Sequence, residues 1–146
     1  MFEFLVQKDK EILIFLNNLG SEQWDWLWLG ITKQFNWTPL FVFIIYLVFK
    51  NFGWKHGGFI LLSMIVLVAF SDQFTNLIKN TVTRLRPNND PSINAQLRTL
   101  ISPRGFSFYS GHAATSTIFS VFVVLMFRKT YKYIYLLLLF PLIFSY

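Results

Sequence analysis

Four long stretches of this chain carry almost no charged side chains, and they limit its possible folds more than any other feature. Apart from Asp72, Asp, Glu, Lys and Arg are absent from residues 34–49, 57–78, 105–127 and 133–146. A helix needs about 20 apolar residues to cross the hydrocarbon core of a bilayer. The pattern therefore favours helices that cross a membrane.

A soluble helical bundle with a phenylalanine-rich core is the alternative explanation for these stretches. Such a bundle needs a polar stripe along each helix, and residues 41–49 and 135–144 contain none. Composition also favours a membrane, because 54% of residues are hydrophobic and only 14% are charged, against roughly 25% charged in soluble domains. Intrinsic disorder, which needs low hydrophobicity and high charge, is excluded.

Two further properties of the composition narrow the function. Cysteine is absent, so the chain can form neither a disulfide framework nor a thiolate metal site. The formal net charge is +6, which in some proteins indicates nucleic-acid binding. Here the basic residues lie between long apolar runs, so we expect no nucleic-acid partner.

The N-terminal region differs from the rest of the chain because it mixes charged and apolar residues. The stretch from Glu3 to Leu16 has the pattern of an amphipathic helix that ends near residues 17–20, and the following segment contains Trp24, Trp26 and Trp28. Tryptophan is enriched where a membrane meets water. We therefore expect residues 1–33 to lie at or dip into the membrane interface, without deciding between the two.

These patterns predict an all-α fold: a polytopic membrane helix bundle that forms a single domain over residues 1–146, with N-terminal amphipathic, interfacial helices. The expected segments are the interfacial residues 1–33, membrane helices at 34–50, 57–86, 110–128 and 130–146, and an outer loop at 87–109.

The short connections between the predicted helices indicate how the chain is oriented in the membrane. They contain Lys50, Lys55, Arg128, Lys129 and Lys132, and cytoplasmic loops are enriched in Lys and Arg. Residues 87–109 then lie on the outer face. This outer region also contains arginines, at positions 84, 86, 98 and 104, and binding an anion such as phosphate would explain basic residues on that side.

A polar stripe follows the end of the second predicted membrane helix. Asp72, Asn76, Lys79, Thr83 and Arg86 are spaced four, three, four and three residues apart. On a helix they would fall within roughly 80° of one another, whereas the residue at position 84 would point away. Ionisable residues inside a membrane segment are candidates for function. The alternative is a purely structural Asp72–Lys79 pair.

A second group of polar residues begins the third predicted membrane helix. Ser110 suits an N-cap, Gly111 lets the backbone approach a ligand, and the N–H groups of a helix start bind phosphate. His112 can exchange a proton near neutral pH. A histidine at a helix start is a weak signal by itself, so the assignment depends on combining both groups.

Together, the two groups resemble the type 2 phosphatidic acid phosphatase superfamily. Residues 79–87 (KNTVTRLRP) match its first motif, Lys-x6-Arg-Pro, and residues 109–112 (YSGH) match its second, Pro-Ser-Gly-His. Tyr109 replaces the usual proline, while the chemically active positions are kept. The similarity covers most of the chain. The superfamily is related in site design to acid phosphatases and vanadium haloperoxidases.

The resemblance implies hydrolysis of a lipid phosphate or diphosphate through a phosphohistidine, with no metal and no cofactor. Candidate substrates are undecaprenyl diphosphate, phosphatidylglycerol phosphate and phosphatidic acid, and nothing in the sequence chooses among them. The site would face the periplasm from a bacterial inner membrane. The implied partners are a membrane lipid substrate and phosphate-like anions.

The same resemblance implies a role for each candidate site residue. His112 would be the general acid, and Asp72 and Asn76 would support the phosphate-binding lysine. The phosphate-binding residues would be Lys79, Arg86, Ser110 and Gly111.

The third motif of the superfamily, Ser-Arg-x5-His-x3-Asp, does not occur among the 146 residues. In similar proteins it supplies the nucleophilic histidine. We therefore expect a C-terminally truncated chain that is itself inactive. Two alternatives remain: a non-enzymatic membrane protein that binds lipid phosphate or scaffolds partners, and a small transporter or channel subunit in which the polar stripe forms a pathway.

Overall fold

The computed structural model describes residues 2–100 and 105–145, and this part of the chain is all-α. Its α-helices are α1 (Phe2–Asn18), α2 (Asp25–Thr32), α3 (Thr38–Val82), α4 (Gly111–Phe127) and α5 (Leu139–Ser145). Short 3-10 helices connect them: η1 (Glu22–Trp24), η2 (Gln34–Trp37), η3 (Pro87–Asn89), η4 (Asn94–Gln96) and η5 (Lys132–Leu138).

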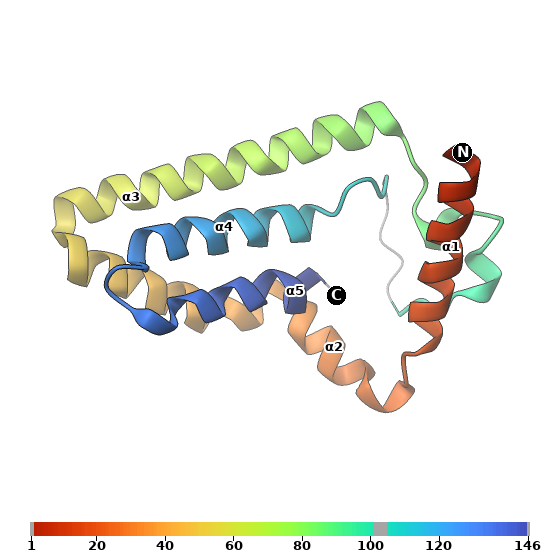
Figure 1. Cartoon of the computed structure of the whole chain (residues 1–146), viewed down its shortest axis with the longest axis horizontal. Helices are drawn as coiled ribbons and strands as arrows, with labels where there is room; N and C mark the ends of the chain where they lie inside the picture. The colour runs from red at the N-terminus through yellow and green to blue at the C-terminus, as the bar shows by residue number, and fades with distance from the viewer. Residues whose placement is uncertain (1, 101–104, 146) are drawn as a thin grey trace.

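Helix α3 is a hairpin of two helical arms that reverses direction at Gly53. The φ and ψ angles of Gly53 are 69° and 174°, a region that is essentially restricted to glycine. Figure 1 shows the chain running in opposite directions in the arm before Gly53 and in the arm after it. The helices predicted at 34–50 and 57–86 are therefore joined by a single-residue turn, because glycine can supply the reversal without a longer loop.

Replacing Gly53 with Ala should lower the free energy of unfolding by about 1–3 kcal/mol, since Ala cannot adopt this backbone conformation without strain. No atom lies within 4 Å of a methyl group built at this position, so the loss would come from the backbone alone. Thermal unfolding in detergent, followed by circular dichroism, measures the change.

Gly58→Ala is the matched control for this substitution. Gly58 lies in the helical second arm and also has open space around an added methyl group, so Ala should stabilise it by up to about 1 kcal/mol. Equal destabilisation by both variants would contradict the role given to the turn.

The two arms of α3, helix α4 and the η5–α5 segment lie as rods along the long axis of the molecule (Figure 1). Their buried apolar residues form one core, which includes Ile44, Leu47, Val48, Phe119, Val123, Phe127, Phe140 and Phe144. Aromatic rings pack edge to face inside it, as in the pair Phe41–Phe119, whose centroids are 5.2 Å apart.

The buried polar side chains of the described residues are all small hydroxyls: Ser71 and Thr75 of α3, and Ser116 and Ser120 of α4. Small residues let neighbouring helices approach closely. They therefore suit the close contact that α4 makes with α3.

Two predicted helix boundaries differ from the structure. The helix predicted to continue to residue 86 ends at Val82, because Thr83 adopts a left-handed conformation with φ of 52°. The segment predicted as a membrane helix at 130–146 begins as the 3-10 helix η5 and becomes α-helical only at Leu139.

Within residues 2–100 and 105–145, one helical segment is long and apolar enough to cross a membrane by length and composition. It extends from Gln34 to Val82 and includes both arms of α3. Helix α4 and the η5–α5 segment are apolar but shorter.

Candidate active site

Lys79 in the last turn of α3 lies beside the first residue of α4. A methyl group built at Gly111 would be 3.7 Å from Lys79 Nζ and 3.5 Å from Thr75 Cγ2. The structure therefore brings a residue of the first motif against the helix start of the second. Because the first N–H groups of a helix lack intrahelical partners and carry partial positive charge, an anion near this position would meet both the ammonium and these donors.

Arg86 follows the end of α3 in an extended conformation, with φ of −69° and ψ of 148°. It does not continue the helical stripe predicted from its spacing, because the helix stops at Val82 and Thr83 turns the chain. Its Nε atom is buried and has no hydrogen-bond partner among the described residues. A buried donor without a partner is costly, and a bound phosphate oxygen would satisfy it.

Backbone contacts join the residues around Arg86 to the segment that leads into α4. Leu85 and Phe106 form an isolated antiparallel bridge. Ser107 donates its N–H to the Arg84 carbonyl at 2.9 Å and its hydroxyl to the Leu85 carbonyl at 3.0 Å. These contacts hold the ends of the outer loop together and bring the two motifs into one region.

Ser110 caps α4, as the sequence predicts, with its Oγ accepting a hydrogen bond from the Ala113 N–H at 3.3 Å. His112, in the first turn, is exposed. Its ring centroid is 5.1 Å from that of Phe144. The imidazole therefore sits at the edge of the aromatic core, where it can reach solvent or a ligand.

One contact at this site was not predicted from the sequence. The Tyr109 and Thr75 hydroxyls form a hydrogen bond of 3.0 Å, and Thr75 also donates to the Ser71 carbonyl. The position of Thr75, one helical turn before Lys79, was the available signal. This contact gives a structural use to Tyr109, which replaces the usual proline of the second motif.

The basic residues near the site fall into paired and unpaired groups. Arg84 pairs with Asp9, Arg98 pairs with Asp25 at 2.5 Å, and Lys10 pairs with Asp90 at 2.7 Å. Within the part of the chain that the structure describes, Lys79 and Arg86 have no acidic partner. Among the described basic residues near the site, these two cations of the first motif are therefore available for an anion.

One of these pairs shows a clear electrostatic effect. Lys10 and Ser92 donate hydrogen bonds to the Asp90 carboxylate and lower its pKa from 3.8 to about 2. The Asp90 carboxylate is therefore charged across the neutral pH range, and on the acid side the pair would be lost as pH falls through this low pKa.

Asp72 and Asn76 are both exposed, and they contact each other. The Asn76 amide donates to the Asp72 carboxylate at 3.4 Å. Among the described residues Asp72 makes no ion pair with Lys79. The alternative structural pair is therefore absent among these residues, because the two side chains are separated by two helical turns, while the support of Lys79 by Asp72 and Asn76 stays a prediction. No three His, Asp or Glu residues in the described ranges are grouped to hold a metal ion.

The family model of the PAP2 superfamily matches residues 57–146, which include both motifs. The chain belongs to the PAP2 superfamily. Lys79, Arg86 and Ser110–His112 all lie in the matched range, so the unpaired cations and the helix start occupy the superfamily part of the chain.

A curated relative of this PAP2 protein comes from Bacteroides thetaiotaomicron and is named lipid A 4'-phosphatase. The two sequences are 34% identical over 142 residues, which cover 94% of this chain and 63% of the relative. The chain therefore spans less than two thirds of the relative's length. No solved structure matches the chain significantly.

Proposed function

We propose that this protein provides the phosphate-binding part of a bacterial membrane phosphatase that acts on a phosphorylated lipid. The observation that carries the proposal is the placement of the unpaired Lys79 ammonium beside Gly111, at the start of α4. Superfamily membership and the relative's name support a lipid phosphate as the substrate class. The 4'-phosphate of lipid A joins undecaprenyl diphosphate, phosphatidylglycerol phosphate and phosphatidic acid as a candidate.

In this proposal each polar group at the site has one task. Lys79 and Arg86 bind the phosphoryl oxygens and balance the charge of the transferring group, which is most of what phosphoryl transfer requires. The Gly111 N–H and Ser110 complete the anion site at the helix start. His112 protonates the leaving oxygen. The nucleophile is the histidine of the third motif, and the reaction uses no metal.

A small cavity near this site is a candidate binding place for the hydrocarbon part of the substrate. It has a volume of about 130 Å³ and is bordered by α3, α4 and α5. Its lining is mostly aromatic and apolar: Phe41, Val68, Phe119, Phe140 and Phe144, together with Gln34, Thr115 and Ser116. Since Phe144 also contacts the His112 ring, hydrocarbon next to the phosphate could extend into this cavity.

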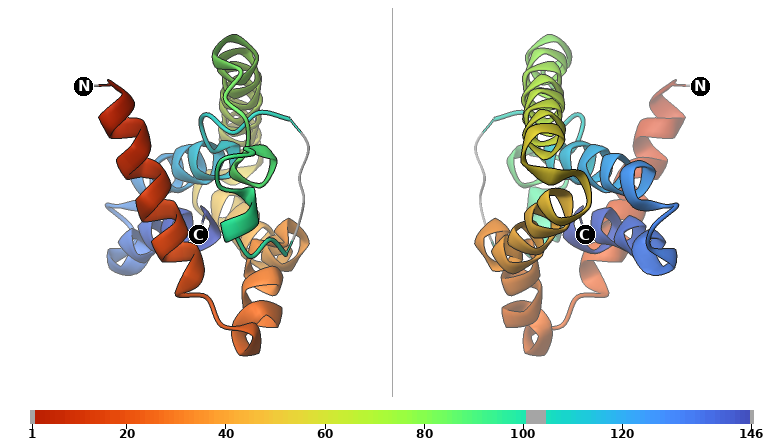
Figure 2. Two further views of the ribbon diagram at one scale, coloured as in Figure 1. Left: turned by 90° about the vertical axis from the view of Figure 1, so that its right-hand side faces the viewer. Right: turned by 90° about the vertical axis from the view of Figure 1, so that its left-hand side faces the viewer.

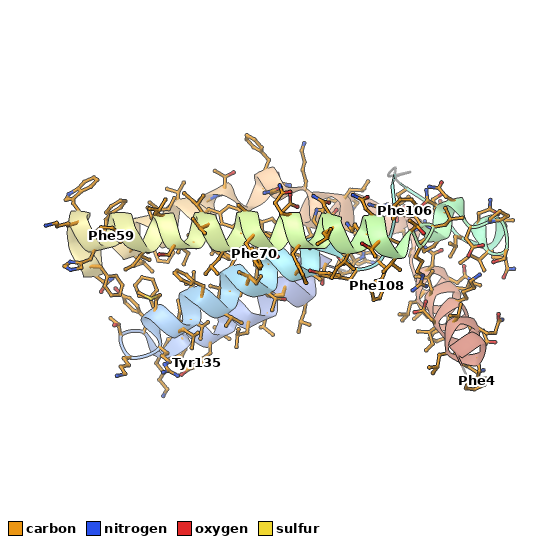
Figure 3. All side chains as sticks on the ribbon, turned by 90° about the horizontal axis from the view of Figure 1, so that it is seen from above. Phe4, Phe59, Phe70, Phe106, Phe108 and Tyr135 are labelled. Atoms are coloured by element: carbon orange, nitrogen blue, oxygen red, sulfur yellow. The ribbon has the colours of Figure 1, made fainter. Side chains whose placement is uncertain are left out.

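The proposal places the rods across the inner membrane as a polytopic bundle. The outward face of the second arm of α3 carries Leu62, Ile65, Val66 and Phe70, each more than half exposed. Figure 3 shows Phe59 and Phe70 along this arm. A contiguous apolar surface of this kind is unusual in contact with water and suits lipid.

The topology can be tested by single-cysteine labelling, because the chain contains no cysteine. The Gly53 turn and the connection after α4 lie at the end of the rods opposite the site (Figure 1). Cysteine at Lys55 or Lys129 should therefore be protected from an impermeant reagent in intact cells, while cysteine at Asn89 should react. All three positions are exposed, and the reverse pattern would contradict the orientation.

Binding measurements test the function. The purified chain in detergent should bind inorganic phosphate or vanadate, and a phosphorylated lipid should compete for the same site while its dephosphorylated form should not. Failure to bind either anion would reject the proposed site. Binding of the lipid without competition from the anion would place the lipid elsewhere.

A further inference from the structure

Helix α1 has an exposed apolar side that no other described segment covers. At about 100° per residue, the exposed apolar residues fall within roughly 120° of the helix circumference. They are Phe4, Leu5, Ile12, Phe15 and Leu16. Three of them, Phe4, Leu5 and Phe15, are at least 60% exposed. A single exposed apolar residue needs no explanation, but a continuous side of a helix does.

The rest of α1 is attached to the outer loop through polar contacts. Asp9 pairs with Arg84, immediately before the bridge that closes the loop. Lys10 binds the Asp90 carboxylate and the Ser92 hydroxyl, each at 2.7 Å.

A second attachment lies near the C-terminal end of α1. The Asn17 side chain accepts from the Arg98 N–H at 2.8 Å and donates to the Arg98 carbonyl at 3.1 Å. Helix α1 is therefore attached at its middle and near its C-terminal end to the first motif and the segment that follows it.

The direction of α1 distinguishes it from the rods. In Figure 1 it runs across the end of the rods where α3 finishes and α4 begins, and Figure 2 shows the same crosswise position from the side. Phe4 lies at its outer end, away from the rods (Figure 3). If the rods cross a bilayer, α1 lies along the bilayer surface on the side of the site.

Two sequence features near the exposed side also suit a membrane surface. Trp24 and Trp26, which follow α1 in the chain, are 54% and 70% exposed, and tryptophan favours the interface. Lys8 is the cation on the apolar side. Its amine pairs with Glu11 and lies 5.9 Å above the Phe4 ring, so its stem can stay with apolar groups while its charge remains in water.

We propose that α1 docks on the outer surface of the membrane through Phe4, Ile12, Phe15 and their apolar neighbours, and thereby holds the outer loop and the phosphate site at the height of lipid headgroups. The proposal rests on the membrane arrangement given under the proposed function. The occupant is the lipid bilayer, because the uncovered apolar side belongs to a helix that runs across the ends of the rods and can therefore lie along the bilayer surface.

Spin labels on single cysteines test the docking in lipid vesicles that contain the whole chain. Labels at Ile12 and Phe15 should be relaxed by oxygen, which concentrates in lipid, and shielded from a water-soluble nickel complex. A label at Gln7, which is exposed outside the apolar side and about 140° around the helix from Ile12, should show the opposite behaviour. Water accessibility at Ile12 and Phe15 would overturn the proposal. Short distances between labels on two chains, without oxygen accessibility, would assign this side to a second copy and also overturn it.

A binding comparison tests the consequence for the site. The double variant Ile12→Asp/Phe15→Asp should bind a phosphorylated lipid in vesicles about tenfold or more weakly, because two apolar side chains leave the lipid. Its binding of inorganic phosphate should be unchanged, and Gln7→Asp should change neither.

Equal binding of vesicle lipid by the double variant and the unchanged chain would reject the role of α1. Absence of phosphate binding in the unchanged chain would instead reject the proposed function, so the two failures are distinguishable.

Discussion

Lys79→Ala should weaken the binding of phosphate or vanadate by roughly tenfold to a hundredfold, and Arg86→Ala should cause a similar loss. Hydrogen bonds to charged groups contribute about 1.5–3 kcal/mol each, and both cations lack an acidic partner among the described residues. The buried Nε of Arg86 adds to the expected loss, because the anion would be its hydrogen-bond partner. Isothermal titration in detergent measures the affinities.

Two other basic residues provide controls for this prediction. Lys129 is exposed after the end of α4, at the opposite end of the rods, and Arg84 is engaged by Asp9. Lys129→Ala should leave the affinity unchanged, and Arg84→Ala should weaken it far less than Arg86→Ala. Equal losses at all four positions would indicate a diffuse electrostatic effect and no defined site.

In a form of the protein that carries the third motif, His112→Ala should lower the rate of phosphate release by roughly 10²–10⁴-fold, the usual contribution of a general acid. The 146-residue chain should show essentially no turnover, because it lacks the third motif. Loss of one member of a cooperating catalytic group removes most of the group's effect. Phosphate release from a phosphorylated lipid, with a chelator present, measures both rates and tests independence from metal.

His56 provides the matched histidine control. It is exposed near the Gly53 turn, at the far end of the rods from the site, so His56→Ala should leave the rate unchanged. His112→Ala should still bind phosphate, since Lys79 and Arg86 remain. Turnover by the 146-residue chain that disappears on His112→Ala would show that the third motif is dispensable and that the assigned roles are wrong.

The sequence predicted the all-α fold and the local features at the start of α4, because both depend on short-range patterns. Apolar runs without charge specify helices, and Ser110 has the side chain that an N-cap needs. That Lys79 and Gly111 lie close together was predicted only from the resemblance to the phosphatase superfamily. The packing of α3 against α4 determines it, and helical spacing within one segment contains no information about that packing.

The errors in the sequence analysis have local physical causes. The regular spacing from Asp72 to Arg86 suggested one continuous helix, but Thr83 can adopt a left-handed conformation that spacing does not reveal. The alternative explanation, a structural Asp72–Lys79 pair, would have to span two turns, whereas Asn76 is one turn away and offers its amide to the carboxylate. Gly53 was predicted to lie in a loop between two helices. The reversal at this single residue depends on its backbone angles, which the sequence pattern does not specify.

The bridge between Leu85 and Phe106 closes the base of the outer loop. The geometry of the site therefore does not depend on how long the loop is. With the base held by Ser107, residues added between these positions would cost only the entropy of a longer closed loop, about 0.6 kcal/mol for each doubling. Insertions between these positions that leave Asp90, Ser92 and Arg98 in contact with the N-terminal helices would therefore keep Lys79 beside the start of α4.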